Sequence, residues 1–179
     1  MKILTEKEAI TLTRPLIYTL VTSLNKKGRP NALGVSWVMR TSIKPLLMAI
    51  SIDRRRYSHR NIQLHKEFVI NYPNKDQARS AWICGVKSGR SIDKIKLAKI
   101  TLVKSKKVKV PTIHDATVAF ECKLIDKFKT GDHTIFVGKV LAMTGNPKKS
   151  KHLFVACDWR LIGLDKKGKS KLNLTKGTI

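Results

Sequence analysis

The tripeptide of Arg56, Tyr57 and Ser58 is the clearest candidate for anion chemistry in this chain. Ser58 is a good N-cap for a helix expected over residues 58–66. A helix N-terminus offers free amide donors and a partial positive charge, and Arg56 would add a fixed charge and a planar donor fork. These groups together would suit a phosphate. The alternative is that Ser58 only caps the helix and Arg56 is one basic residue among many.

Two glycine-containing segments are further candidates for a binding site. Residues 84–89 read CGVKSG, and their glycines permit positive φ and close approach of a ligand to the backbone. A plain turn that ends a helix explains these glycines equally well. In residues 131–140, GDHTIFVGKV, His133 follows a glycine turn at the start of a strand, where side chains are often exposed toward a cleft. The alternative is that His133 bonds Asp132 or the backbone at that turn.

Several common sites are missing from the sequence. No Ser-His-Asp or Cys-His constellation, Walker motif or dinucleotide-binding glycine fingerprint is present. The remaining histidines show no ligand spacing and are assigned to the surface or to packing: His59, His65, His114 and His152. The three cysteines form no CxxC pair and have no histidine at metal spacing, so we expect no metal and no disulfide framework: Cys84, Cys122 and Cys157. Each cysteine is interpreted as a small buried residue.

The charge of the chain is unusual, with 37 basic and 12 acidic side chains and a formal net charge of +25. Such a field attracts polyanions. The basic residues gather at 104–109, at 148–151 and in a lysine-rich segment from about residue 165. Because aromatic residues are scarce there, the stacking platforms of a single-strand binder are missing. We therefore interpret the charge as a solvated surface, and weak, salt-sensitive nucleic-acid binding or steering of phosphorylated cofactors stays an alternative.

The length of 179 residues suits one compact domain over residues 1–179. The first twenty residues carry acids and hydroxyls among the apolar positions, which makes a poor signal peptide. No run of about 18 apolar residues exists to span a membrane. We expect a cytoplasmic protein that makes no membrane contact.

Strand signals dominate the chain. Segments rich in β-branched and aromatic residues predict strands at 16–24, 31–40, 46–53, 67–71, 117–124, 135–143 and near 153–164. In the 117–124 segment Val118, Phe120, Cys122 and Leu124 fall on one face, while Glu121 and Lys123 fall on the other. Strands that follow in quick succession with short turns indicate an antiparallel barrel wall.

Helix signals are fewer. Thr5 and Glu8 have capping-box spacing for a short helix over residues 5–11. Further helices are expected at 58–66, at 76–84 with Asn74 as its cap and Gly85 as its end, and at 93–98 after a start at Ser91. The sum is a mainly β fold with helices (α+β), in which an antiparallel barrel carries two or three helices.

An ordered set of motifs from about Arg14 to Val140 resembles the flavin-reductase-like family, the FMN-binding split barrels. The motifs stand here as Arg14-Pro15, Gly28, Asn31-Ala32, Ser36-Trp37, Pro45-Leu46-Leu47, Arg56-Tyr57-Ser58, Phe68-Val69-Ile70-Asn71, Cys84 to Gly89, Asp93-Lys94 and Gly131-Asp132-His133. The resemblance implies a split barrel, a homodimer with FMN near the subunit interface, and an anionic FMN tail anchored at Arg56, Tyr57 and Ser58.

The same resemblance implies the other cofactor-binding residues. Asn31 would bond the ribityl hydroxyls or the polar edge of the ring, and Ala32 would leave room for the backbone to approach it. Because side chains alternate along a strand, Ser36 and Trp37 should point to opposite faces, so Trp37 is either a stacking partner or a core residue. The remaining implied positions are Asn61, Asn71, Cys84, Ser88, Gly89 and Lys94. His133 would border the flavin and a nicotinamide pocket, as the tentative catalytic residue.

The function implied is an FMN-dependent oxidoreductase that accepts electrons from NADH, NADPH or another reduced carrier. Two alternatives from other classes are an FMN-binding electron carrier or storage protein without nicotinamide turnover, and a basic barrel that binds nucleic acid. A split barrel that holds haem or pyridoxine phosphate is a further possibility.

Overall fold

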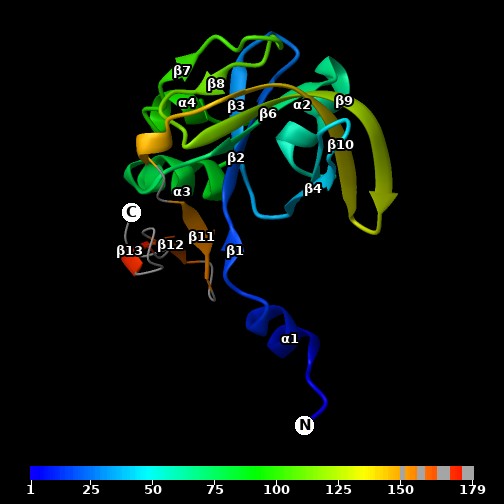
Figure 1. Ribbon diagram of the computed structural model, residues 1–179, viewed down its shortest axis with the longest axis vertical. Helices are drawn as coiled ribbons and strands as arrows, with labels where there is room; N and C mark the ends of the chain where they lie inside the picture. Colours follow the sequence, from blue (N-terminus) through cyan, green and yellow to red (C-terminus); the bar gives the residue numbers. More distant parts are fainter. Residues whose placement is uncertain (150–151, 157–159, 165–169, 175–179) are drawn as a thin grey trace.

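The computed structural model describes residues 1–149, 152–156, 160–164 and 170–174, and its centre is a seven-stranded antiparallel sheet (Figure 1). The strand order is β3-β2-β6-β9-β10-β5-β4. The bounds are β2 Thr19–Leu24, β3 Pro30–Val35, β4 Val38–Ser42, β5 Leu47–Asp53, β6 Glu67–Tyr72, β9 Val118–Thr130 and β10 His133–Thr144. The two end strands, β3 and β4, are consecutive in the chain and are joined by Ser36 and Trp37 alone. The sheet therefore curls into a barrel, and the expected antiparallel β fold with helices is confirmed.

The barrel interior is filled by residues that alternate along its strands, as the period of two requires. On β2 and β3, Val21 and Leu33 face inward, while Leu20 and Ala32 face a second core on the outside. The large inward side chains include Phe68, Phe136, Ile50, Ile52 and Ile70, and each is at most 2% exposed. Since both faces of β2 are covered, all six of its residues are buried.

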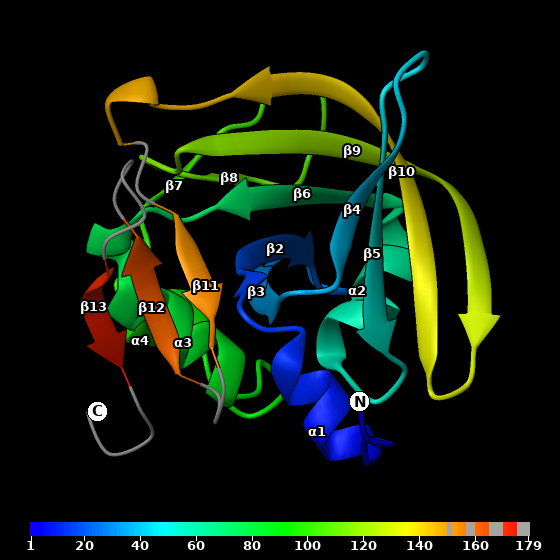
Figure 2. The same cartoon turned by 60° about the horizontal axis from the view of Figure 1, so that its bottom comes forward.

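The second core lies between the outer face of the barrel, helix α3 (Ala78–Val86) and a small sheet in the order β1-β11-β12-β13 (Figure 2). The small-sheet bounds are β1 Leu16–Ile17, β11 Leu153–Val155, β12 Leu161–Leu164 and β13 Ser170–Leu174. The strand expected over residues 16–24 is therefore divided at Tyr18, because β1 pairs with β11 whereas β2 pairs with β3 and β6.

Tyr18 decides how closely α3 approaches the barrel. Its side chain is buried, and its hydroxyl donates to the Ala81 carbonyl at 3.2 Å. A Cβ added at either Gly34 or Gly85 would overlap that hydroxyl. The two glycines thus make room for the tyrosine between strand and helix.

The helices differ in detail from the sequence predictions. α1 (Glu6–Leu12) has the expected capping box, since the Thr5 hydroxyl accepts from the Glu8 amide and the Glu8 carboxylate accepts from the Thr5 amide. α4 (Lys94–Leu97) is capped by Asp93, so its predicted start at Ser91 is wrong. Gly85 was expected to end a helix but lies inside α3, because the helix needs a residue without a side chain where it meets Tyr18.

The helix predicted over residues 58–66 also starts at a different residue in the structure. α2 (Tyr57–His65) begins after Arg56, which is extended and makes no side-chain cap bond. Ser58 is therefore the second helical residue, and its expected role as the N-cap is wrong. None of the helices in the described residues combines the length and the apolar character that a membrane crossing demands.

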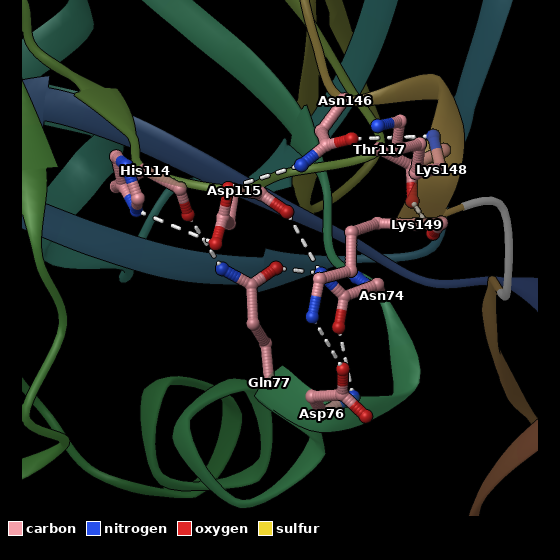
Figure 3. A network of polar contacts seen from close by, with 9 residues as sticks. All are labelled: Asn74, Asp76, Gln77, His114, Asp115, Thr117, Asn146, Lys148 and Lys149. Carbon is pink, nitrogen blue, oxygen red and sulfur yellow. Dashed lines mark hydrogen bonds and ion pairs between the residues drawn. The ribbon is translucent and has the colours of Figure 1, made fainter.

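A polar network joins the segment that follows β6 to two loops from other parts of the chain (Figure 3). The Asn74 amide donates to the Asp115 carbonyl at 2.7 Å, and its oxygen accepts from the Asp76 amide at 2.8 Å. Asn146 donates to the Asp115 carboxylate at 3.2 Å, and Lys149 pairs with Asp76 at 2.9 Å. Asn74 was predicted to cap the helix over residues 76–84. It caps instead the short 3₁₀ helix η1 (Lys75–Gln77), and α3 follows with Gln77 at its N-cap and no side-chain cap bond.

The cysteines follow the sequence prediction where the structure describes them. Cys84 and Cys122 are free and fully buried, and burial raises the pKa of Cys84 to about 11 and that of Cys122 to about 12. Cys157, Lys151 and most of the lysine-rich segment from about residue 165 lie outside the described residues.

Glu121 on β9 contradicts the simple alternation expected for its strand. It is fully buried, because the segment between β7 (Leu102–Val103) and β8 (Thr112–Ile113) covers the outer face there. Its two carboxylate oxygens accept from the backbone amides of Lys106 and Lys107 at 2.8 and 2.6 Å. These charge-assisted hydrogen bonds hold the covering segment on the barrel.

The substitution Glu121→Gln should lower the free energy of unfolding by about 2 kcal/mol, because a carboxamide places a donor against one of the two amides and leaves it unsatisfied. Urea denaturation of the pure protein measures this. Glu67→Gln is the matched control, since the Glu67 carboxylate accepts a single described bond, from the Lys109 amide at 2.8 Å. Equal effects of the two changes would refute the special role of Glu121.

Candidate functional site

A cleft opens where α2 begins, where β3 passes and where the chain leaves α3. Its smaller chamber has a volume of about 270 Å³. The residues that line this chamber are Asn31, Leu33, Asp53, Arg55, Arg56, Tyr57, Ser58, Val86, Lys87, Ser88, Gly89, Arg90 and Lys94. Five of these side chains are cationic and one is a carboxylate. The chamber therefore carries a surplus of positive charge that suits an anion.

The start of α2 points donors at this chamber. The first amides of an α-helix have no partner within the helix, and no side chain caps α2. Ser58 is buried, and its hydroxyl accepts from the Asn31 side-chain amide at 2.8 Å. An anion at this end would meet backbone amides, the Ser58 hydroxyl and the helix dipole together.

Lys94 is a buried cation at the same chamber. The residue is 3% exposed, and its ammonium donates to the Cys84 carbonyl at 2.9 Å. Burial lowers the pKa of Lys94, since the charged form loses water. No carboxylate pairs with Lys94 in the described part of the chain. A ligand that carries negative charge would supply the counter-ion.

Two arginines and an aspartate hold the rim of the chamber in place. The Arg90 guanidinium donates to the Arg55 carbonyl at 2.8 Å, which links the loop after α3 to the chain before α2. Arg55 in turn makes side-chain hydrogen bonds of 2.8 to 3.2 Å to Asp53, and these bonds hold the pKa of Asp53 well below its usual range. Asp53 is thus committed to Arg55, while Arg56 has no ion pair among the described residues.

The larger chamber of the cleft has a volume of about 580 Å³. Its lining is Arg14, Tyr18, Leu33, Gly34, Val35, Ser36, Trp37, Ser51, Ile52, Asp53, Arg55, Arg56, Trp82, Gly85, Val86, Asp132, His133, Val155 and Leu161. Many of these residues are aromatic or aliphatic. The two chambers share Leu33, Asp53, Arg55, Arg56 and Val86, so they form one continuous cleft with a basic end and a more apolar end.

Trp37 and His133 stand together at the larger chamber. Their ring centroids are 4.6 Å apart, and Trp37 is 55% exposed, which excludes the core role for its indole. His133 Nδ1 lies 2.6 Å from the Asp132 carboxylate, and this hydrogen bond lowers the pKa of Asp132. Both interpretations of His133 thus apply: it pairs with Asp132 and it lines the cleft.

Ser36 and Trp37 line the same chamber, although strand alternation predicted opposite faces. The reason is that neither residue belongs to a strand. β3 ends at Val35 and β4 begins at Val38, so the chain turns between them and the alternation is broken.

The structure brings ten of the predicted site residues to the cleft and leaves four elsewhere. Ala32 faces the second core, and Cys84 is buried in the same cluster. Asn61 lies against Ser23, 3.4 Å from its hydroxyl. Asn71 donates to the Leu20 carbonyl and accepts from the Ile113 amide at 2.9 Å, so it joins strands. These four residues do not line the cleft, and we leave them out of the site.

Sequence reasoning missed several lining residues. Tyr18 and Trp82 come from separate segments and carry no local signal of a site. Arg55 precedes the tripeptide of residues 56–58 and Arg90 follows the 84–89 segment, so adjacency could have found both. The lack of a side chain at Gly89 keeps space in the smaller chamber, because a Cβ there would overlap the Asn31 amide oxygen.

A flat apolar ring system that carries a flexible tail with a terminal phosphate would fit this cleft. The phosphate would meet the basic end, and the ring would occupy the larger chamber. The residues present thus fit a flavin mononucleotide, which has this shape and charge.

Comparisons with known proteins agree with this fit. Residues 13–158 match the model of the flavin reductase like domain. An uncharacterized protein of Pyrococcus abyssi is 42% identical over 132 residues, which cover 72% of this chain and 76% of the relative. The NADH:riboflavin 5'-phosphate oxidoreductase of Streptomyces pristinaespiralis is 25% identical over 142 residues, 79% of this chain and 78% of that protein.

Among solved structures, the flavoredoxin of Desulfovibrio vulgaris superposes with a TM-score of 0.82 at 24% identity, and the match covers 93% of this chain and 94% of that one. This likeness shows the fold. Together with the family model, it establishes that the chain belongs to the flavin-reductase-like family of FMN-binding split barrels.

Proposed function

We propose that this protein is an FMN-dependent oxidoreductase that passes electrons from NADH, NADPH or another reduced carrier through bound FMN. The observation that carries the proposal is the single cleft in which a basic chamber adjoins a larger, aromatic-lined one. FMN has the matching pattern, with a dianionic phosphate at one end and a flat, largely apolar tricycle at the other.

At the basic end, the residues of the chain bind and orient. Arg56 and Lys94 supply positive charge, and Ser58 with the first amides of α2 supplies donors. Ser88 and Gly89 bring the backbone of the loop after α3 against the same chamber. The side-chain amide of Asn31 is held by Ser58, which fixes its oxygen for the ribityl chain.

At the larger end, a bound flavin supplies the hydride and electron chemistry, so the protein needs no nucleophile of its own. This agrees with Cys84, whose thiol is buried away from the cleft with its pKa raised to about 11. Trp37 forms a wall of the chamber. Asp132 holds one ring nitrogen of His133, which leaves Nε2 without a described partner and ready to orient a nicotinamide or to balance charge on the ring.

The first prediction concerns the cofactor itself. The purified protein should be yellow or should take up FMN on reconstitution, with a visible flavin spectrum. FMN should bind about 100-fold more tightly than riboflavin, because riboflavin lacks the phosphate and so the charge-assisted bonds at the basic end. A colourless protein that takes up no FMN refutes the proposal, and an absorption spectrum of haem or pyridoxine phosphate type would assign another cofactor.

Lys94 gives this prediction a pH dependence. Below its lowered pKa Lys94 is charged and attracts the phosphate; as the pH rises through that pKa, the charge and the attraction are lost. FMN affinity should therefore fall at alkaline pH in the natural protein. In Lys94→Gln it should be about 10- to 100-fold weaker at neutral pH and should not show this decline. Fluorescence titration with FMN measures both, with Lys96→Gln as the exposed control.

A separate prediction concerns turnover. His133→Ala should leave FMN content unchanged and lower the rate of NADH or NADPH oxidation about 10- to 100-fold, the loss of one hydrogen bond to a charged group. The matched control is His114→Ala, since His114 also lies beside an aspartate but does not line the cleft. If the two variants are equally active, His133 has no role in turnover.

The second candidate function is an FMN-binding electron carrier without nicotinamide turnover, and the same cleft supports it. Steady-state oxidation of NADH and NADPH separates the two. An FMN-loaded protein that oxidises neither compound, yet is reduced by another electron carrier, would favour the carrier.

We further propose that the protein is a homodimer in the cytoplasm, with FMN near the subunit interface. In support, edge strand β4 follows the cleft residue Trp37 directly. Met39 on β4 is 56% exposed, and Ile43, which follows the strand, is 73% exposed. Covering such apolar groups favours association. Light scattering should give twice the chain mass of 20.2 kDa; a monomer with full FMN occupancy would contradict the dimer alone.

A further inference from the structure

One end of the barrel gathers exposed cations from four separate segments. We call this surface the lysine patch, and its members are Lys26, Lys27, Arg29, Lys66, Lys104, Lys106, Lys107, Lys109 and Lys123. All nine side chains are exposed. They come from the β2–β3 turn, the end of α2, the segment between β7 and β8, and β9.

Direct contacts show that these segments lie side by side. Leu24, at the base of the β2–β3 turn, packs in one buried cluster with Val108 and Val110. The Lys109 amide donates to Glu67, which pairs in register with Lys123. In Figure 1 the blue β2–β3 turn and the green segment after β7 share the upper edge of the molecule. The cations therefore form one surface.

Among the described residues, the carboxylates near the patch accept hydrogen bonds from the backbone and form no ion pair with its cations. Glu121 is buried and accepts from the amides of Lys106 and Lys107, so it binds their backbone and not their ammonium groups. Glu67 accepts from the backbone of Lys109 in the same way. Of the five ion pairs in the described residues, none involves a side chain of the lysine patch.

The segment that carries four of these lysines is also held firmly. The Ser105 hydroxyl bonds the Val110 carbonyl at 2.7 Å and the Thr112 hydroxyl at 2.8 Å. The Thr22 hydroxyl donates to the Pro111 carbonyl at 2.8 Å, which ties the segment to β2. Its lysines consequently project from a fixed backbone, and a partner need not order that backbone in order to bind.

We propose that the lysine patch binds the phosphate backbone of double-stranded nucleic acid without sequence preference. Cations alone suffice for such binding. The strongly exposed aromatic side chains of the described residues are Trp37 and Phe128, and neither belongs to the patch. Stacking on single strands, insertion into a lipid interface and the aromatic core of a protein interface all need such groups. A duplex backbone needs none of them.

This binding is independent of the proposed flavin function. The patch touches the C-terminal end of α2, where His65 bonds the Asn25 carbonyl at 2.9 Å, while the cleft is at the N-terminal end. The nine residues of α2 separate the two by about 13 Å at a rise of 1.5 Å per residue. No member of the patch lines the cleft.

The test measures the affinity of the full chain for a labelled duplex of about 20 base pairs between about 50 and 200 mM salt. The patch variant replaces four lysines: Lys26→Gln, Lys27→Gln, Lys106→Gln and Lys107→Gln. Binding by the natural protein should weaken steeply with salt. The variant should bind about tenfold or more weakly at 100 mM salt, with a slope of log affinity against log salt that is shallower by about two to four.

A matched control distinguishes binding by the lysine patch from binding by the net charge of the whole chain. It replaces four exposed lysines elsewhere: Lys7→Gln, Lys44→Gln, Lys96→Gln and Lys129→Gln. This control should keep most of the natural affinity, and circular dichroism and thermal unfolding should show that both variants are folded.

Several results would overturn the proposal. Equal loss in the two variants would assign the binding to net charge alone, and absence of duplex binding at low salt would end it outright. Tighter binding to single strands, or to vesicles that contain anionic lipid, would assign the patch to that partner. FMN uptake plays no part in these readouts, so failure here and failure of the flavin function are distinguishable.

Discussion

The position of Tyr18 between strand β3 and helix α3 is the constraint on which the cleft depends. Gly34 and Gly85 lack the side chains that would collide with its hydroxyl, and the hydroxyl donates a hydrogen bond to the Ala81 carbonyl. This packing sets the distance between α3 and the barrel. The loop that follows α3 can then meet the start of α2, and Arg90 closes the contact on the Arg55 carbonyl.

Several of the acidic side chains in the described residues form hydrogen bonds within the protein. Asp53 is bound by Arg55, Glu121 and Glu67 bind backbone amides, and Asp132 binds His133. In the described part of the chain, no ion pair involves Arg56 or Lys94 at the cleft or a side chain of the lysine patch. In a chain with 37 basic and 12 acidic side chains, this use of the acids leaves both surfaces with a surplus of positive charge.

Local signals predicted much of the fold. The capping box of Thr5 and Glu8 and the shared face of Phe120 and Cys122 depend on neighbours in the sequence, and the structure has both. Asn74 is a cap as predicted, but of η1 and not of α3. The mainly β barrel followed from the density of strand signals, and the ordered motifs indicated the family.

The details that failed depend on contacts between distant segments. Gly85 stays inside its helix because of Tyr18, and Glu121 is buried because residues 104–110 cover it. Asn71 has its amide engaged by β2 and β8, so its polar character says nothing of a ligand. Periodicity and propensity carry no information on such pairs, and the full lining of the cleft is likewise a product of the packed fold.

The two residues that join β3 to β4 have two structural roles. Ser36 and Trp37 are the covalent connection between the two end strands of the barrel, and they also line the larger chamber. A molecule that binds against them restrains this connection as well. Occupancy of the chamber and resistance of the barrel to opening are therefore linked, and the linkage grows with the logarithm of the ligand concentration above its dissociation constant.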